Sequence, residues 1–577
     1  MAEAQPGPEA AVTRVDLPAI SPEEPAEEPG RRGGVSGLLK SSAVMALGTI
    51  ASRLTGFIRT AVLVIALGTH ALGDVYNTAN TFPNVIYDLL LGGVLTAVHV
   101  PMLVRALEKD RKYGEEYEAR LLTLVLGALL ALTAIAMVCA PLLVDLYAGS
   151  YDKQKHDLAV LFALFFLPQI FFYGVGALAG ASLNARGSFA APMWTPVLNN
   201  VVVIVIGVAF LFVAGRGVGP ANITHTEILL LAGGTTLGIV IQTIAMWPSL
   251  RKVGFRYRPR FDFRREELAP VGGMALWTLL YVAIQQVGFV VNTNIANGAG
   301  DKGAREGITY GVGLTPWSNA YLLFQLPYAI VGVSVVTALL PQMSRHASER
   351  RYDLVREDMS SALNLSSVVI VPSAALLFAL APEMTTLFFA HGSTKISDAL
   401  MIGNVLQAFT FALVPFAIYQ LLLRVFYALA DTRTPAFMAV FNVAISITLG
   451  LIGYHTLPTD KIVMGISIAL GVSWTFGCFV AAFILRRRLN GLGARHIVTS
   501  HVKIAVATVP ALLFALAVHL VSFKFFYYNV LSSLGVLVIG GGGAMVLYFL
   551  VARLLRIPEM ESLQRTMMAR LPGRGAS

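Results

Sequence analysis

Charged residues are scarce in this chain. Asp, Glu, Lys and Arg make up only 13% of its 577 residues, whereas they make up about a quarter of an ordinary soluble domain. Hydrophobic residues make up 56% and gather in long blocks, and a helix needs about 20 such residues to cross a bilayer. The composition excludes an ordinary soluble protein and predicts an all-α membrane protein that crosses the bilayer many times.

Several chemical signatures are also missing. The two cysteines, Cys139 and Cys478, both lie inside apolar blocks, which excludes a cysteine metal cluster and a disulfide framework. Alternating ten-residue patterns typical of a β-barrel are absent. The sequence has no Gly-rich phosphate loop, no HExxH motif, and no loop long enough to fold as a soluble domain. We therefore predict no enzymatic activity, no cofactor and no metal site.

The apolar blocks predict about fourteen transmembrane helices. They fall near residues 41–67, 75–104, 121–147, 157–183, 189–214, 227–249, 268–297, 308–341, 361–381, 398–428, 435–454, 462–485, 501–523 and 528–552. If both termini are cytoplasmic, most loop Lys and Arg residues fall on the cytoplasmic side, as topology requires. The net charge of +10 is thus explained by topology, and we expect no nucleic-acid partner.

The sequence divides into six predicted parts. Residues 1–36 contain six prolines and seven acids, a composition typical of a disordered tail. The predicted parts are a cytoplasmic tail (1–36), an N-lobe of six helices (37–250), a basic cytoplasmic loop (251–267), a C-lobe of six helices (268–488), two extra helices (499–555) and a cytoplasmic tail (556–577).

Two halves of the chain resemble each other. Pro83 and Pro101 bracket the second segment as Pro327 and Pro341 bracket the eighth, and the spacing from Pro192 to Asn199 recurs from Pro435 to Asn442. The offset is 240 to 244 residues in each case. The pattern predicts two pseudo-symmetric six-helix lobes around a central cavity, a common plan among transporters.

Two arginines lie inside the first apolar segment, Arg53 and Arg59. An arginine at the centre of a spanning helix costs about 2.5–3.5 kcal/mol on insertion scales, so we expect a cavity beside this helix. The two side chains point roughly 120° apart on a straight helix, and arginine suits phosphate oxygens. We predict that both bind an anionic substrate; pairing with Asp74 or Asp88, or an interfacial position for Arg53, are the alternatives.

The second segment contains Asp74 at its start and Asp88 near its middle. Asp74 is open to two interpretations, a helix cap or a residue that lines the cavity. Asp88 could neutralise the arginines of an empty cavity, or carry a proton.

Neutral amides form the remaining candidates. Such amides in spanning helices link helices to each other or bind sugar and peptide groups of a substrate. The predicted set is Asn84, Gln286, Asn292, Asn319 and Gln325.

Four motifs resemble the MurJ (MviN) family of bacterial lipid II flippases, within the superfamily of multidrug and oligosaccharidyl-lipid exporters. They are SRLTGFIRT at 52–60, FPN at 82–84, LNARGSFAAP at 183–192 and FYALADTRTP at 426–435. The resemblance covers essentially residues 40–555. It implies that Arg53 and Arg59 are the family's essential first-helix arginines and that Asp74 is its second-helix aspartate. Tyr87 and Asp88 stand where many members have basic residues.

The resemblance implies a flippase that moves lipid II, the undecaprenyl-diphosphate-linked peptidoglycan precursor, from the inner to the outer leaflet by alternating access. Its expected location is the bacterial plasma membrane, and its expected partners are lipid II, membrane lipids and cell-wall synthesis proteins bound through the tails. Two alternatives stay open: an exporter of another polyprenyl-linked oligosaccharide, and a membrane scaffold for cell-wall enzymes that does not transport.

Overall fold

The computed structural model describes residues 35–90, 111–215, 217–262, 272–525 and 528–560. Most of both predicted tails and residues 263–267 of the predicted basic loop lie outside this part of the chain. The described residues contain helices and connecting loops but no strand, as predicted.

The helices follow one another along the chain with short connections. In order they are α1 (Val35–Leu67), α2 (Ala71–Leu90), α4 (Arg111–Val138), α5 (Ala140–Ala148), α6 (Lys153–Phe166), α7 (Gln169–Ala185), α8 (Ala190–Ala214), α9 (His225–Ile228), the π-helical turn η2 (Leu229–Gly233), α10 (Gly234–Ile244), α11 (Trp247–Lys252), α13 (Gly272–Arg305), α14 (Leu314–Ser348), α15 (Tyr352–Phe389), α16 (Ile396–Ala428), α17 (Arg433–Thr456), the 3-10 turn η4 (Thr459–Lys461), α18 (Ile462–Arg488), α19 (Ala494–Phe525), α20 (Val530–Val536), the π-helical turn η5 (Leu537–Gly541) and α21 (Gly542–Leu554).

Twelve helical segments of the described chain are long and apolar enough to cross a membrane. Helices α2 and α14 are not among the twelve, but they occupy the positions of the second and eighth predicted segments. Three predicted segments are interrupted among the described residues: 121–147 between α4 and α5, 157–183 between α6 and α7, and 227–249 between α10 and α11. Prolines explain these breaks, because Pro141 and Pro248 lie in the first turns of α5 and α11 and Pro168 directly precedes α7, positions where proline has no helical hydrogen bond to lose.

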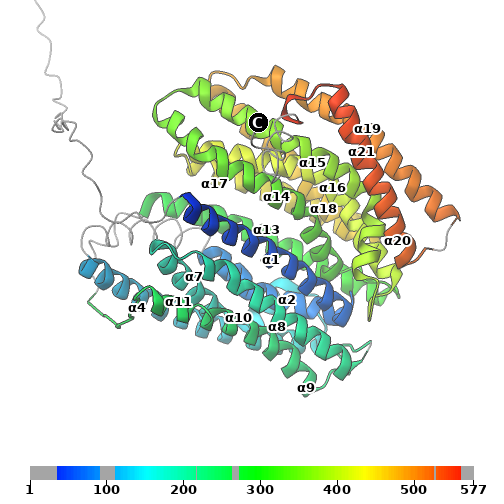
Figure 1. The fold of residues 1–577 in the computed structure, drawn as a ribbon. Helices are drawn as coiled ribbons and strands as arrows, with labels where there is room; N and C mark the ends of the chain where they lie inside the picture. Colours follow the sequence, from blue (N-terminus) through cyan, green and yellow to red (C-terminus); the bar gives the residue numbers. More distant parts are fainter. Residues whose placement is uncertain (1–34, 91–110, 216, 263–271, 526–527, 561–577) are drawn as a thin grey trace, which may run out of the picture.

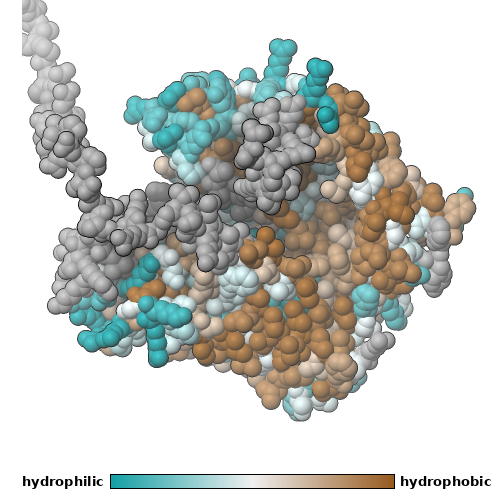
Figure 2. Space-filling model, viewed as in Figure 1, coloured by the Kyte–Doolittle hydropathy of each residue, from teal (hydrophilic) through white to brown (hydrophobic). Residues whose placement is uncertain are grey.

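The helices form two groups that lie side by side (Figure 1). In the first group α1 packs against α8, and α10 packs against α7 and α8. In the second group α13 packs against α17, and α18 packs against α16 and α17. The last helices, α19 to α21, lie along α15 at the edge of the second group. Figure 2 shows a broad hydrophobic surface across the middle of the visible face, as a bilayer requires.

The two groups repeat one packing detail. Asn199 of α8 is buried against Gly238 of α10, where a Cβ would lie 2.5 Å from its Oδ1. Asn442 of α17 is buried against Gly477 of α18, where a Cβ would lie 2.6 Å from its Nδ2. Only glycine permits either approach. This correspondence supports the predicted internal repeat.

Buried apolar side chains form three main clusters. The largest lies mostly within α13 to α18, the second within α1 to α10, and the third between α15 and the last helices α19 to α21. This distribution supports lobes at 37–250 and 268–488 followed by two further helices. The domain boundaries themselves stay a prediction.

The two ends of the bundle differ in their loops. We call one end of the bundle the basic end. Helix α4 begins there, and the helices that end there are α7, α11, α14, α16 and α18. Arginines at this end, such as Arg186 and Arg488, pair with acids. At the other end, which we call the junction end, α1 ends and α2, α14 and α16 begin. The ion pairs described at the basic end each lie within one group.

One of these ion pairs is buried. The guanidinium of Arg186 contacts both carboxylate oxygens of Glu118, and the side chains are 14% and 2% exposed. A matched but more open pair joins Arg488 to Asp431 in the second group, with side chains 40% and 17% exposed.

Arg186→Met is expected to lower the free energy of unfolding by about 3–5 kcal/mol, because it leaves the Glu118 carboxylate buried without its partner. Arg488→Met should lower it by about 1 kcal/mol or less, since water reaches that pair. Unfolding by SDS titration in mixed micelles measures both. Equal losses in the two variants would contradict this assignment.

Candidate functional site

A first polar cavity lies between α1, α2, α7, α8, α10 and the start of α14. It has a volume of about 670 Å³, and its lining includes Arg59, Asn77, Asn80, Asn84 and Asn319. Asn77, Asn80 and Asn84 share one face of α2, because residues three and seven positions apart lie on the same side of a helix. The cavity is thus walled by amides around one guanidinium.

Arg59 is the charged residue of this cavity. It is half-buried, its Nε has no hydrogen-bond partner, and it forms no ion pair with the described side chains. A buried donor without a partner is costly, and arginine offers further donors in a fixed fork. The arrangement leaves a cation available to an anionic ligand.

A second polar cavity lies between α2, α13, α14, α17 and α18, with a volume of about 1120 Å³. Its lining includes Asn84, Gln285, Gln286, Asn292 and Gln325. Asn84 lines both cavities, so the two adjoin at α2. The Asn292 Oδ1 is buried and has no hydrogen-bond partner in the described structure.

Aromatic rings complete the second cavity. Trp317, Tyr321 and Trp474 line it, and none of the lining residues that the structure describes is charged. Neutral amides together with aromatic faces suit a neutral polar ligand such as a sugar or a peptide. The first cavity thus offers a cation and the second offers neutral donors, acceptors and rings.

The structure brings six of the nine predicted site residues to the two cavities. They are Arg59, Asn84 and Asn319 in the first cavity, and Gln286, Asn292 and Gln325 with the shared Asn84 in the second. Their contact with a substrate stays a prediction. The side chain of Asp88 lies outside the described part of the structure.

Arg53 lines neither cavity. Its side chain is exposed on α1, six residues nearer the basic end than Arg59. Asn200 of α8 holds the same stretch of α1 by donating to the Ser52 carbonyl and the Thr55 hydroxyl, at 3.0 Å each. The role predicted for Arg53 in substrate binding is therefore not supported by this cavity geometry and stays a prediction.

Asp74 caps a helix of the other group. It is buried and its Oδ1 accepts a hydrogen bond of 2.7 Å from the backbone N–H of Thr315, in the first turn of α14. A Cβ on Gly313 would overlap the Asp74 carboxylate, so this approach requires glycine. Of the two interpretations left open by the sequence, the structure shows a cap, at α14 rather than at α2.

A second buried carboxylate, Asp398, joins the groups at the same end. It is fully buried and accepts hydrogen bonds of 2.9 Å from the Thr69 hydroxyl, the Gly311 N–H and the Lys395 N–H. Nε2 of His70 lies 3.2 Å from its Oδ1. The turn between α1 and α2 is thereby attached to the start of α16 and to the loop before α14.

Further contacts extend this junction toward α13. Asp301 accepts from the Ser150 hydroxyl at 2.7 Å and from Lys155 Nζ at 2.5 Å, and Asn297 donates to Thr78 and to the Tyr147 carbonyl. We call these contacts, with those of Asp74 and Asp398, the inter-group junction. They close the space between the two groups at the junction end.

Sequence reasoning identified Asp74 as a possible helix cap but missed the other residues of this junction and part of the cavity lining. Asp398 and Asp301 lie at segment ends, where an acid is normally assigned to solvent or to its own helix. Asn77 and Asn80 were detectable, because their spacing from Asn84 predicts one polar face on α2.

His70 makes the inter-group junction sensitive to pH. Its contact with the Asp398 carboxylate raises the pKa of His70 above its usual value of 6.5; the charge of Asp74 also raises it, and burial and Lys395 oppose the shift. The protonated imidazole therefore stabilises the closed junction fully below the usual pKa. That contribution is lost as the pH rises through the raised pKa.

Raising the pH from about 6 to about 8 is expected to increase the fraction of molecules with a separated junction. Spin labels at Lys153→Cys and Lys461→Cys, in a background without the native cysteines, report the separation by pulsed EPR. His70→Gln should remove the pH dependence, and the control His225→Gln at the same end should keep it. A pH response that survives in His70→Gln would assign it to another group.

Comparisons with known proteins identify the family of this chain. A family model described as lipid II flippase MurJ matches residues 63–538. A probable lipid II flippase MurJ of Rhizobium meliloti is 27% identical over 437 residues, 74% of this chain and 77% of that protein. The corresponding protein of Haemophilus influenzae is 26% identical over 485 residues, 81% of this chain and 89% of that protein.

Two solved structures share the fold. The inward closed conformation of a lipid II flippase MurJ matches with a TM-score of 0.69 at 20% identity, covering 89% of this chain and 99% of that one. An inward-facing multidrug resistance MATE family transporter matches with a TM-score of 0.62 at 17% identity, covering 77% and 96%. Because the family model spans most of its length, this chain belongs to the MurJ family of lipid II flippases.

Proposed function

We propose that this chain moves lipid II from the inner to the outer leaflet of the bacterial plasma membrane by alternating access. The observation that carries the proposal is Arg59, a half-buried guanidinium with an unpaired Nε, in a cavity that adjoins a larger neutral one. Family membership and the names of the relatives support the choice of lipid II.

The two cavities match two parts of this substrate. The diphosphate of lipid II is anionic, and a guanidinium binds phosphate oxygens through paired N–H donors. The disaccharide is neutral and polar, and the peptide presents amide groups, both of which suit the amides and rings of the second cavity. In this proposal Arg59 binds the diphosphate and Gln286, Asn292 and Gln325 bind the sugars or the peptide.

The position of Arg53 suggests an earlier step. It is exposed and lies about 9 Å along α1 from Arg59 toward the basic end, at 1.5 Å per residue. In this proposal Arg53 attracts the diphosphate at the mouth of the first cavity, before Arg59 binds it. Asp74 has a different role from the two arginines, because it holds the start of α14 in place and does not face either cavity.

The orientation follows from the loops. Basic loops stay in the cytoplasm, so we assign the basic end and both termini to the cytoplasmic side. The inter-group junction then closes the outer side, and the substrate enters from the inner leaflet. Release requires the junction to separate and the basic ends to approach each other. Binding of cell-wall proteins by the tails stays a prediction, because the tails lie almost wholly outside the described residues.

Two other functions remain to be distinguished from this one. An exporter of another polyprenyl-linked oligosaccharide would use the same diphosphate contact, so Arg59 does not separate the two substrates. A scaffold without transport needs no polar cavity inside the bilayer, and the two cavities therefore argue against it. The identity of the lipid that accumulates without this protein separates all three functions.

Arg59→Ala is expected to abolish growth support in the native host when the wild-type chain is depleted, and lipid II should then accumulate on the inner face of the membrane. Arg59→Lys keeps the charge but loses the fork, so we expect partial support. The control Arg486→Ala removes an exposed arginine at the basic end that lines neither cavity, and it should support growth normally.

Membrane levels of each variant are compared by immunoblot, because only an inserted protein tests the site. Normal growth of an inserted Arg59→Ala variant would refute the assigned role of the first cavity. Accumulation of a different polyprenyl-linked sugar would refute lipid II as the substrate and leave the cavity geometry intact.

A further inference from the structure

An apolar groove lies on the outer side of the first group near the basic end. It has a volume of about 1010 Å³ and is formed by α4, α7, α10, α11 and the loop after α11. Gln169 and Tyr173 of α7 line the first polar cavity, whereas Phe172 and Val175 of the same helix line this groove. The groove therefore opens away from the substrate cavities, and we call it the outer groove.

The loop after α11 forms the end wall of the outer groove. Phe255 and Tyr257 line the groove, and the Tyr257 hydroxyl lies 3.1 Å from the Thr123 hydroxyl of α4. The backbone N–H of Arg260 donates to the same Thr123 hydroxyl at 3.0 Å. These contacts hold the loop against α4.

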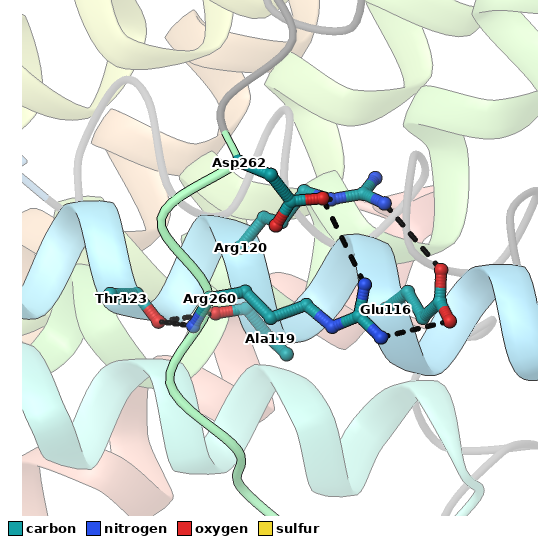
Figure 3. Close-up of polar contacts among 6 residues, drawn as sticks. All are labelled: Glu116, Ala119, Arg120, Thr123, Arg260 and Asp262. Atoms are coloured by element: carbon teal, nitrogen blue, oxygen red, sulfur yellow. Dashed lines mark hydrogen bonds and ion pairs between the residues drawn. The ribbon is translucent and has the colours of Figure 1, made fainter.

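Four charged side chains fasten the loop further along (Figure 3). Arg260 Nη2 lies 2.9 Å from Glu116, and Arg120 Nε lies 3.1 Å from Asp262. Arg120 also contacts Glu116, and Arg260 also contacts Asp262, so the two arginines and two acids form one closed set. The wall of the outer groove is therefore a built feature of the fold.

Exposed cations surround the same wall. Arg251, Lys252, Arg256 and Arg258 are all exposed, and none forms an ion pair with the described residues. Burial alternates along the loop, so Phe255 and Tyr257 face the groove while Arg256 and Arg258 face outward. The guanidinium of Arg251 lies 5.5 Å from the ring centre of Trp247, which lines the groove.

We propose that the outer groove binds an anionic glycerophospholipid, with an acyl chain between α4, α7 and α10 and the headgroup phosphate at Arg251 and Lys252. The groove offers an apolar lining at bilayer depth, Trp247 has the amphipathic ring typical of the membrane interface, and basic residues beside spanning helices bind anionic headgroups. Figure 2 shows hydrophilic residues around the loop that follows α11, directly beside the hydrophobic surface of α10.

Charge decides between the possible lipids. A zwitterionic phospholipid fills the groove equally well but gains little from four unpaired cations. A second copy of this chain would bring its own cations against them and be repelled. The site lies outside both substrate cavities, so this inference does not depend on the transport function proposed above.

Fluorescence of Trp247 tests the site, because bromine atoms on an acyl chain quench a nearby indole. The purified full chain is placed in phosphatidylcholine nanodiscs with a small fraction of brominated phosphatidylglycerol or, separately, brominated phosphatidylcholine. The Trp247→Phe variant isolates the signal of this residue among the five tryptophans. We expect the Trp247 signal to be quenched preferentially by brominated phosphatidylglycerol.

Two variants separate the cations from the groove. Arg251→Gln with Lys252→Gln should weaken the preference for phosphatidylglycerol about tenfold, and Val175→Phe with Ala179→Leu should fill the groove and reduce quenching by that lipid. The matched control, Arg486→Gln with Arg487→Gln, removes two exposed cations from the last turn of α18 at the same end and should leave the preference unchanged.

Three results would overturn the proposal. Equal quenching by the two brominated lipids would show that charge does not select the lipid. A preference that survives in the filled groove would show that the cations attract lipid without this site. If neither brominated lipid quenches Trp247 and the particle contains twice the expected protein mass, a second copy of the chain covers the groove.

Discussion

The structure depends on buried carboxylates that bridge its two groups of helices. Asp74 and Asp398 have most of their surface removed from water. Asp74 accepts a hydrogen bond from the backbone N–H of Thr315 in the other group, and Asp398 accepts one from the side-chain hydroxyl of Thr69 in the other group. A buried carboxylate without donors is strongly unfavourable. When the groups separate, each acid must exchange the donor from the other group for water, while Asp398 keeps its Gly311 and Lys395 donors. A partial separation that breaks the bonds to Thr315 and Thr69 before water enters is unfavourable, so the inter-group junction favours two states, fully bonded or hydrated.

The internal repeat gives the two halves one framework and different surfaces. Asn199 and Asn442 occupy equivalent buried positions, and each lines the polar cavity of its own half. The first cavity adds Arg59, whereas the second adds tryptophan and tyrosine rings. A symmetric backbone thus gives a cavity with one charged compartment and one neutral compartment, which is what a ligand with a charged end and a neutral end requires.

Much of the fold could be predicted from the sequence, because the cost of exposing backbone groups to lipid forces each long apolar block into a helix. The cost of placing a charge in lipid also made it possible to predict Arg59 as a cavity residue. The inter-group junction could not be predicted in this way. Asp398 takes two of its three hydrogen-bond donors from Thr69 and Gly311, residues far from it in the sequence, and no spacing rule predicts these two contacts. The exposure of Arg53 also depends on packing, since α8 contacts α1 on both sides of it, at Thr49 and at Thr55, and leaves its side chain exposed.

The two polar cavities share one lining residue, Asn84. A ligand that fills both must therefore pass this amide and touch α1 on one side and α17 or α18 on the other. A ligand of a given length then fits only some angles between the two groups, because rotation of one group changes the distance that the ligand spans. A truncated analogue that occupies a single compartment feels no such strain. Such an analogue would act as a competitive blocker, because it fills the cavity without favouring either state.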